Sequence, residues 1–146
     1  MAHDFQAFPE LTNSQMSLYY FESPHKQIVE SFKAKVVKVT DGDTVRVRTT
    51  FRDFDFPIRF AHIAAPELKE GGLDSRRWLE SQIGGEDIEV IVDPDNRVGK
   101  WGRIIGEVLH RGMSINELSI LQGHSVPFGE RESETIPDFG RELDNL

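Results

Sequence analysis

Four polar clusters along this chain carry side chains suited to chemistry on a phosphate ester. They are Asp41-Gly42-Asp43-Thr44, Arg59, Pro66-Glu67 and Lys100-Trp101-Gly102-Arg103. Arginine suits a phosphodiester because its planar guanidinium stays charged and donates to two phosphate oxygens. A carboxylate can hold a hard cation or accept a proton. Taken singly, each cluster also has an ordinary interpretation: a turn, a solvated strand face, or a cap after proline. Their chemistry depends on a fold that brings them together.

A β-hairpin is expected to position the first cluster. Four valines share one face of residues 32–50, and three basic side chains take the other: Val37, Val39, Val45 and Val47 against Lys38, Arg46 and Arg48. Asp41-Gly42 at the centre predicts a tight turn, because such turns need residues that tolerate positive φ. Asp43 has the parity of the inner valines, so the pattern points its carboxylate inward.

The rest of the sequence predicts a third strand, then a helix, two more strands and a second helix. In FDFPIRFAHI, apolar residues alternate with Asp55 and Arg59, and Pro57 indicates a sheet edge or a bulge. A helix is expected over 73–83, with Asp74 as its N-cap, Leu73 and Trp78 at staple positions, and Gly84-Gly85 as its end. Strands follow over 87–93 and 103–110. A Ser114/Glu117 capping box then starts a short helix that ends at Gly123.

This order of elements predicts an α+β fold that is mainly β. It is a five-stranded OB-fold barrel with two flanking helices, because such a barrel curls a short-stranded sheet so that few free edges remain. Residues 1–31 form an extended, aromatic-rich N-terminal arm, residues 32–128 the barrel domain, and residues 129–146 an acidic tail. The arm shows no sustained periodicity. Its aromatic content favours packing, either on its own barrel or on another protein.

The linked motifs resemble the staphylococcal-nuclease-like, or thermonuclease, family over about residues 33–128. They occur in the family's order: V-x-D-G-D-T, then R-F-A-H-I-A-A-P-E for the family's R-L-x-x-I-D-A-P-E, then K-W-G-R for K-Y-G-R. The resemblance implies an OB barrel with Ca²⁺-dependent hydrolysis of DNA and RNA. It makes Arg59 and Arg103 the phosphate-gripping pair, Glu67 the residue that activates water, and Asp43 and the Ala65 backbone carbonyl ligands of calcium.

The chain departs from the family's pattern at Ala64. The family has its second calcium-ligating aspartate there, and a methyl group cannot coordinate a cation, so Ca²⁺ binding should be weaker. Asp41 and Asp43 would share an ion only if the turn did not splay them apart. Lys100, Trp101 and Phe128 are the expected nucleic-acid contacts, since either aromatic ring can stack on a base. Packing of Trp101 on its own loop is the alternative.

Charge and composition limit the partners. The net charge of -8 argues against a polyanion, but residues 32–128 carry fourteen basic and fifteen acidic residues, so the acidity lies in the two ends. No apolar run is long enough for a membrane span, and the N-terminus lacks the pattern of a secretory signal. We therefore expect no membrane partner, and a location in the cytoplasm or within an assembly. The absence of cysteine excludes disulfides and thiolate metal sites.

Three functions are compatible with the sequence. The first is a metal-dependent phosphodiesterase that hydrolyses DNA or RNA, impaired by Ala64. The second is a degenerate nuclease domain that serves as a structural component of a larger assembly, for example a virus particle, held there by residues 1–31. The third binds nucleic acid without cutting it. The set Arg59, Glu67 and Arg103 favours the enzyme, because nothing in the fold requires three charges around one rim.

Overall fold

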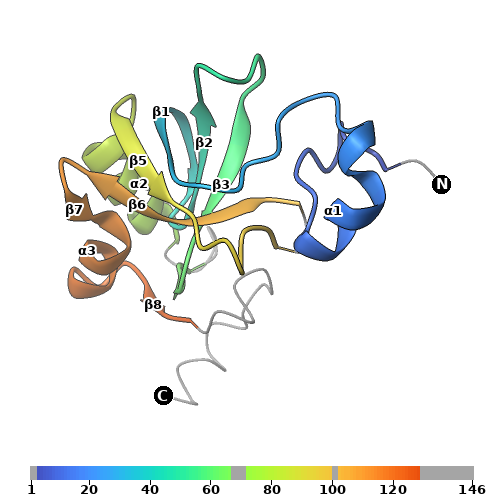
Figure 1. Ribbon diagram of the computed structural model, residues 1–146. Coiled ribbons are helices and arrows are strands. Elements are labelled where there is room, and N and C mark those ends of the chain that lie inside the picture. The colour runs from blue at the N-terminus through green and yellow to red at the C-terminus, as the bar shows by residue number, and fades with distance from the viewer. Residues whose placement is uncertain (1–2, 67–71, 100–101, 129–146) are drawn as a thin grey trace.

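The computed structural model describes residues 3–66, 72–99 and 102–128 (Figure 1). Its strands are β1 (Phe32–Asp41), β2 (Thr44–Arg48), β3 (Phe56–Phe60), β4 (Ile63–Ala64), β5 (Asp87–Ile91), β6 (Ile104–His110), β7 (Met113–Ser114) and β8 (Val126–Pro127). Its helices are α1 (Asn13–Tyr19), α2 (Gly72–Ile83) and α3 (Ile115–Leu121), with a 3₁₀ turn η1 (Tyr20–Glu22). The acidic tail predicted over 129–146 lies outside the described residues.

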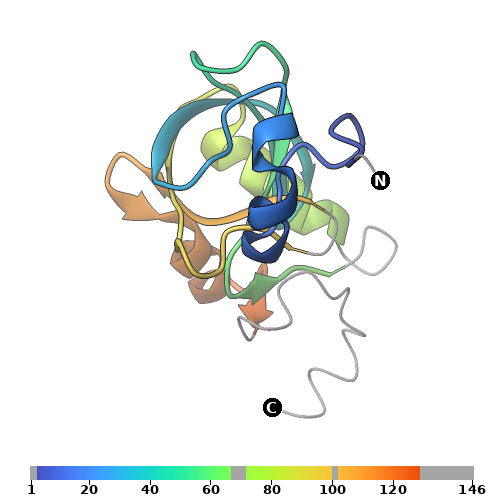
Figure 2. The same cartoon turned by 45° about the vertical axis from the view of Figure 1, so that its right-hand side comes forward.

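Five of these strands close into a barrel. β1 pairs with β2 and β5, β2 pairs with β3, and β5 pairs with β6. A parallel ladder between β3 and β6 completes the circle, whose curvature is visible in Figure 2. The interior is filled by apolar side chains that include Val36, Val45, Val47, Ile58, Phe60, Val90, Ile104 and Val108. The predicted mainly-β fold with an OB-like five-stranded barrel is confirmed.

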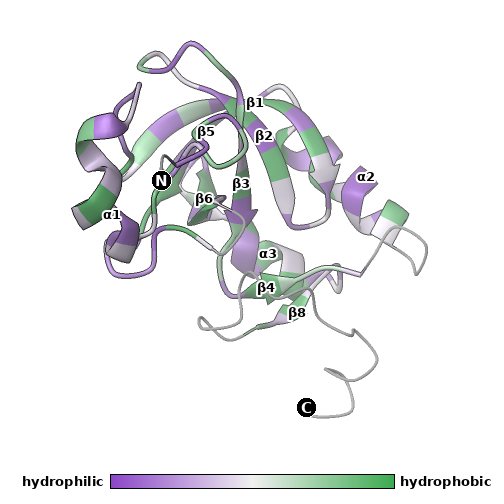
Figure 3. Cartoon of the chain, turned by 90° about the vertical axis from the view of Figure 1, so that its right-hand side faces the viewer, coloured by the Kyte–Doolittle hydropathy of each residue, from purple (hydrophilic) through white to green (hydrophobic). Residues whose placement is uncertain are grey.

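A bulge in β1 changes the predicted face of one valine. The register of β1 against β2 shifts between Val36 and Lys38. Val36 is therefore fully buried, whereas Val37 is 37 % exposed. The prediction that Val37 lines the core is wrong, because one extra residue in a strand reverses the alternation that precedes it. Alternating hydrophilic and hydrophobic residues along β1 can be followed in Figure 3.

Strand β3 is interior to the barrel, so the expectation that Pro57 marks an edge or a bulge is wrong. Pro57 lies opposite Arg46 of β2. The ladder to β6 begins one residue later, at Ile58 and Ile104. A residue without an N–H is tolerated here because it precedes that ladder.

The two predicted helices are present with small differences at their starts. α2 begins at Gly72, so Asp74 lies in its first turn and is not its N-cap. Gly85 follows α2 with a φ of 72°, which fits the expected glycine stop. Ser114 Oγ accepts the Glu117 N–H at the start of α3. Trp78 packs on His124 and donates to Gln122 Oε1, which joins α2 to the end of α3.

The N-terminal arm is more ordered than its sequence predicts. Residues 13–19 form α1, with a Thr12/Gln15 capping box, on the opposite side of the molecule from α2 (Figure 3). Glu10 and Leu11 are buried, and Glu10 forms ion pairs with Arg52 and Arg97 of the barrel domain. This arm therefore packs on its own barrel. α1 buries none of its own residues, however, and Leu18 is 72 % and Phe21 98 % exposed.

Two further features complete the described chain. β4 and β8 pair as a separate two-stranded sheet that the sequence pattern did not predict, and β7 extends β6 as a short hairpin. No helix in the described ranges is long and apolar enough to cross a membrane.

Candidate functional site

Asp43 lies where the β1–β2 turn meets the loop that follows β4. Its Oδ2 accepts the Ala65 N–H at 2.9 Å and its Oδ1 accepts the Thr44 hydroxyl at 3.0 Å. Its side chain is 13 % exposed, so the carboxylate is largely buried. Three elements therefore converge on one carboxylate: the turn, β3 through Arg59, and the chain after β4.

Gly42 allows this convergence through its small size. A Cβ on Gly42 would lie 2.7 Å from the Ala65 Cβ and 2.8 Å from the Ser75 Cβ, closer than real contacts allow. Gly42 is absent from the residues with positive φ, so the predicted reason for this glycine is wrong. Close approach of the turn to Ala65 and to α2 explains it.

Arg59 is buried beside Asp43. It is only 4 % exposed, so its interpretation as a solvated strand residue is wrong. Its Nη1 donates to the Phe60 carbonyl at 2.8 Å and lies 3.5 Å from Asp43 Oδ2. The pairing of Thr44 with Arg59 in the β2–β3 ladder sets this proximity. The sequence motifs predicted one common site for Asp43, Arg59 and Ala65, and the fold brings these three together.

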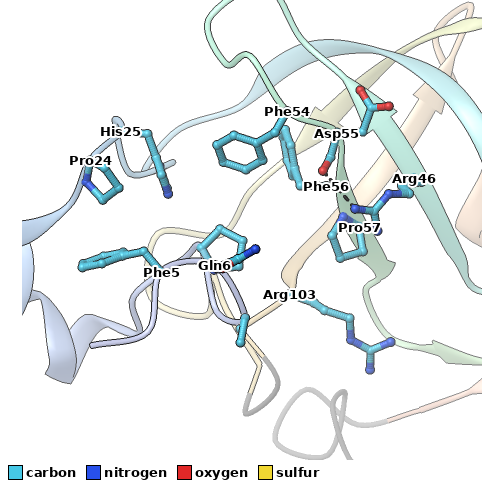
Figure 4. Close-up of a pocket in the computed structure, with 13 residues that line it drawn as sticks. Phe5, Gln6, Pro24, His25, Arg46, Phe54, Asp55, Phe56, Pro57 and Arg103 are labelled. Carbon is cyan, nitrogen blue, oxygen red and sulfur yellow. Dashed lines mark hydrogen bonds between the residues drawn. The ribbon is translucent and has the colours of Figure 1, made fainter. Parts of the chain in front are cut away.

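Arg103 approaches the same region from the start of β6. In the parallel ladder Arg59 pairs with Ile105, and Arg103 precedes Ile105 by two residues. Arg103 therefore lies directly before β6, the strand that pairs with the Arg59 strand. Arg103 also lines a pocket between the arm and the barrel, at the end beyond Pro57 (Figure 4).

The other predicted site groups are Glu67, Lys100, Trp101, Phe128 and the Ala65 carbonyl. Glu67, Lys100 and Trp101 lie outside the described residues, and their roles stay predictions. Phe128 is 6 % exposed and its N–H donates to the His62 carbonyl at 2.7 Å. Stacking of a base on this buried ring would require the segment to move. Ala65 reaches Asp43 through its N–H, and the ligand role of its carbonyl also stays a prediction.

The two aspartates of the turn are electrostatically coupled. Burial, together with the hydrogen bond and charge of Asp43, raises the pKa of Asp41 to about 7. Burial also opposes the charge of Asp43, but Arg59 and hydrogen bonds from Asp41, Ala65 and Thr44 outweigh it and lower the pKa of Asp43. The two carboxyl groups are therefore close enough to affect each other's pKa. At neutral pH Asp43 is ionised and Asp41 is partly protonated.

A divalent cation at this turn would meet a reduced set of oxygen ligands. Asp41 and Asp43 supply carboxylates, whereas Ala64 is fully buried in β4 and supplies none. Across the described ranges, no group of three or more His, Cys, Asp or Glu side chains is placed to hold a metal ion. A cation bound at this turn would offset the repulsion between the negative charges of Asp41 and Asp43. A weak calcium site at this turn therefore stays a prediction.

Sequence reasoning missed the pocket beside Arg103. Phe5 and His25 of the arm face Phe54 and Arg46 of the barrel across it (Figure 4). The aromatic content of residues 1–31 was the available signal. It indicated that the arm packs, but not which part of the barrel it packs against.

Comparisons with known proteins do not supply a function. No protein-family model matches the chain. Over 105 residues it is 26 % identical to an uncharacterized protein of Bacillus anthracis, and the aligned part covers 67 % of this chain and 48 % of the relative. The chain thus spans about half the length of that relative. The function is therefore proposed from the geometry of the site.

The Asp41 carboxyl predicts a pH-dependent stability. Its pKa is about 7 in the folded protein, against an ordinary value of 3.8. Between these values the unfolded chain releases a proton that the folded protein keeps, so the free energy of unfolding should fall as pH rises from 4 to 7 and then level off. Asp41→Asn should remove this slope and be more stable than wild type at pH 8. Partial exposure of Asp41 screens the effect, so we expect about 2 kcal/mol. Urea denaturation between pH 4 and 8 measures both curves. Parallel curves for the two proteins would mean that Asp41 does not carry the slope.

Ala64→Asp should make stability and calcium binding interdependent. Ala64 is fully buried, so an aspartate there places a charge in the interior, and the free energy of unfolding in chelator should fall by about 2–4 kcal/mol. Added Ca²⁺ should bind about tenfold more tightly than to wild type, restore the stability and raise any cleavage. Calorimetric titration and thermal unfolding with and without Ca²⁺ measure these changes. Ala64→Asn, which has the shape without the charge, is the matched control. Unchanged Ca²⁺ affinity in Ala64→Asp would show that the inferred metal position is wrong.

Proposed function

We propose that this protein is a metal-dependent phosphodiesterase that hydrolyses DNA or RNA. The observation that carries the proposal is the buried contact of Arg59 with Asp43, at 3.5 Å, where the β1–β2 turn, β3 and the Ala65 N–H meet. A buried ion pair is costly unless its geometry is well satisfied, and it is weak evidence of a stabilising role. Its place at one end of an OB-like barrel, beside the segment that carries Arg103, supports a role in binding an anion.

Each residue has a distinct part in this hydrolysis. Negative charge grows on the equatorial oxygens of a phosphodiester as it becomes five-coordinate, and fixed arginines aimed at them stabilise that state more than the ground state. Arg59 and Arg103 fill this role, and the carbonyl of Phe60 orients Arg59 through its Nη1. Glu67 accepts the proton of the attacking water. A Ca²⁺ held by Asp41 and Asp43 would add positive charge and polarise that water.

Release of acid-soluble nucleotides from denatured DNA and from RNA tests the proposal. The wild type and Glu67→Ala are compared with Ca²⁺, Mg²⁺, Mn²⁺ or chelator. Metal-dependent cleavage that Glu67→Ala loses would support a nuclease that tolerates Ala64. Absence of cleavage under every condition would overturn the proposal.

A role in a larger assembly is the second candidate, and one observation favours it. Leu18, Tyr20 and Phe21 are 72, 51 and 98 % exposed on α1 and η1 of the arm. Large apolar side chains gathered on one surface are typical of protein contacts. Truncation at residue 31 would remove Glu10 from its two arginines, so substitution is the cleaner test. Leu18→Gln with Phe21→Gln should lower the mass seen by size-exclusion chromatography if these residues form an interface.

A further inference from the structure

The pocket between the arm and the barrel has the size of a ligand site. Its volume is about 650 Å³, within the range of roughly 300–1,000 Å³ common for small-molecule pockets. One wall comes from the arm on either side of α1, and the other from β2, β3 and the segment that leads into β6 (Figure 4). The pocket is distinct from the cluster around Asp43, and Arg103 is the predicted site residue that borders it.

Aromatic rings line the inner part of this pocket. His25 lies edge to face with Phe54 at a centroid distance of 5.1 Å, and with Phe5 at 6.2 Å. Phe5 and His25 belong to the arm, whereas Phe54 belongs to the chain that leads into β3. Planar aromatic walls suit a planar ligand, because stacking is tolerant of the ligand's substituents.

His25 presents a specific hydrogen-bonding group beside these rings. Its Nδ1 lies 3.2 Å from the Lys26 carbonyl. A carbonyl only accepts, so Nδ1 carries the proton in the neutral ring and Nε2 is an acceptor. Nε2 is buried and has no hydrogen-bond partner in the described part of the chain. Because Nε2 has almost no accessible surface, an N–H or NH₂ group of a ligand would reach it only after the surrounding side chains move.

The other end of the pocket is positive. Arg46 and Arg103 line it, and Arg46 donates to the Asp55 carbonyl at 3.1 Å. The Asp55 carboxylate also borders the pocket, but it pairs with Arg48 at 3.0 Å. The Asp55 carboxylate is therefore already paired with an arginine outside the pocket lining. A ligand with an aromatic part and an anionic part matches this division of the pocket.

The place of the pocket in the barrel points to the same class of ligand. It lies on the face of β2 and β3, beside the segment between β5 and β6. OB-fold barrels bind oligonucleotides on the face of their second and third strands and on two loops, one between strands 1 and 2 and one between strands 4 and 5. The pocket borders the strand face and the second loop, but not the turn between β1 and β2. Here β5 and β6 are the fourth and fifth strands of the barrel. The arm adds a wall to that face.

From these observations we propose that the pocket binds an unpaired base of a single-stranded DNA or RNA. The base lies among Phe5, His25 and Phe54, and the sugar-phosphate extends past Arg46 toward Arg103. This inference rests on the proposed function and adds a base subsite to it. The N-terminal arm thus forms part of the substrate site.

Fluorescence anisotropy of two labelled pentamers tests the subsite in the full-length protein. One is pentathymidylate and the other is the matched abasic deoxyribose-phosphate chain, both in chelator so that no cleavage occurs. Wild type should bind pentathymidylate about tenfold more tightly than the abasic chain. Phe5→Ala and His25→Ala should each lose most of this preference and leave abasic binding unchanged. Tyr20→Ala, on the same arm but outside the pocket, is the matched control and should behave as wild type.

The outcomes separate this subsite from the proposed function. Equal binding of both pentamers by wild type, or an unchanged preference in both Phe5→Ala and His25→Ala, would overturn the subsite. If the base subsite fails in this way but the wild type cleaves nucleic acid, the proposed phosphodiesterase activity stands without the base subsite. Base-dependent binding that both variants lose, with no cleavage by wild type, would support the subsite and overturn the phosphodiesterase. No binding and no cleavage would overturn both.

Discussion

Replacing Glu10 with alanine should lower the free energy of unfolding by about 3–5 kcal/mol. Glu10 is 2 % exposed, and its carboxylate pairs with Arg52 and with Arg97. It also accepts the Ile28 N–H at 3.0 Å. Removing it leaves two buried guanidinium groups without their counter-charge, and the penalty for an uncompensated buried charge exceeds the loss of one contact. Burial lowers the pKa of Arg97 and Glu10 opposes that shift, which shows the same dependence.

Asp55→Ala provides the matched control for this prediction. Asp55 pairs with Arg48, whose side chain is 65 % exposed, and an exposed ion pair contributes about 0–1 kcal/mol. Urea denaturation at pH 7 measures both variants against wild type. Similar small losses in Glu10→Ala and Asp55→Ala would show that the arm is not held by Glu10. A large loss of unfolding free energy in Glu10→Ala alone would show that Glu10 holds residues 3–31 in place on the barrel.

The barrel could be predicted from sequence because its signals are local. Strand alternation, the turn at Asp41-Gly42 and the glycine stops each depend on a few neighbouring residues, and together they give the order of strands and helices. The bulge at Val37 could not be predicted, since it depends on the register of β1 against β2. For a similar reason, the sequence alone would place the charges of Glu10, Arg52 and Arg97 in solvent. Their burial depends on partners 42 and 87 residues away.

Three of the predicted site residues lie together in the structure, but the contacts between them did not follow from the sequence. Motif order predicted that Asp43, Arg59 and Ala65 belong to one site, and these residues meet. Their bonding follows from three-dimensional placement: Ala65 faces Asp43 with an N–H, and Arg59 is held by its neighbour's carbonyl. The pocket beside Arg103 combines segments from both ends of the described chain. No local pattern carries information about such a combination.

Arg59→Lys should reduce phosphodiester cleavage by about 10²–10³-fold while leaving the fold intact. Lysine keeps the positive charge that faces Asp43, so the buried carboxylate retains a partner and the free energy of unfolding should change by about 1 kcal/mol or less. It loses the planar fork that lets arginine bind two phosphate oxygens while Nη1 stays on the Phe60 carbonyl. The loss should therefore appear in kcat rather than in stability, because the fork is used most fully in the transition state.

Rates of acid-soluble release and urea denaturation on the same preparations separate these effects. Arg48→Lys makes the identical change at an exposed arginine of β2 and should leave the cleavage rate unchanged. Wild-type cleavage by Arg59→Lys would mean that this residue supplies charge alone, and that the Asp43–Arg59 pair has a structural role. Loss of cleavage together with a large loss of stability would point to the same structural role. Only a kcat loss without a stability loss assigns Arg59 to the transition state, because a group that merely supports Asp43 would affect folding first.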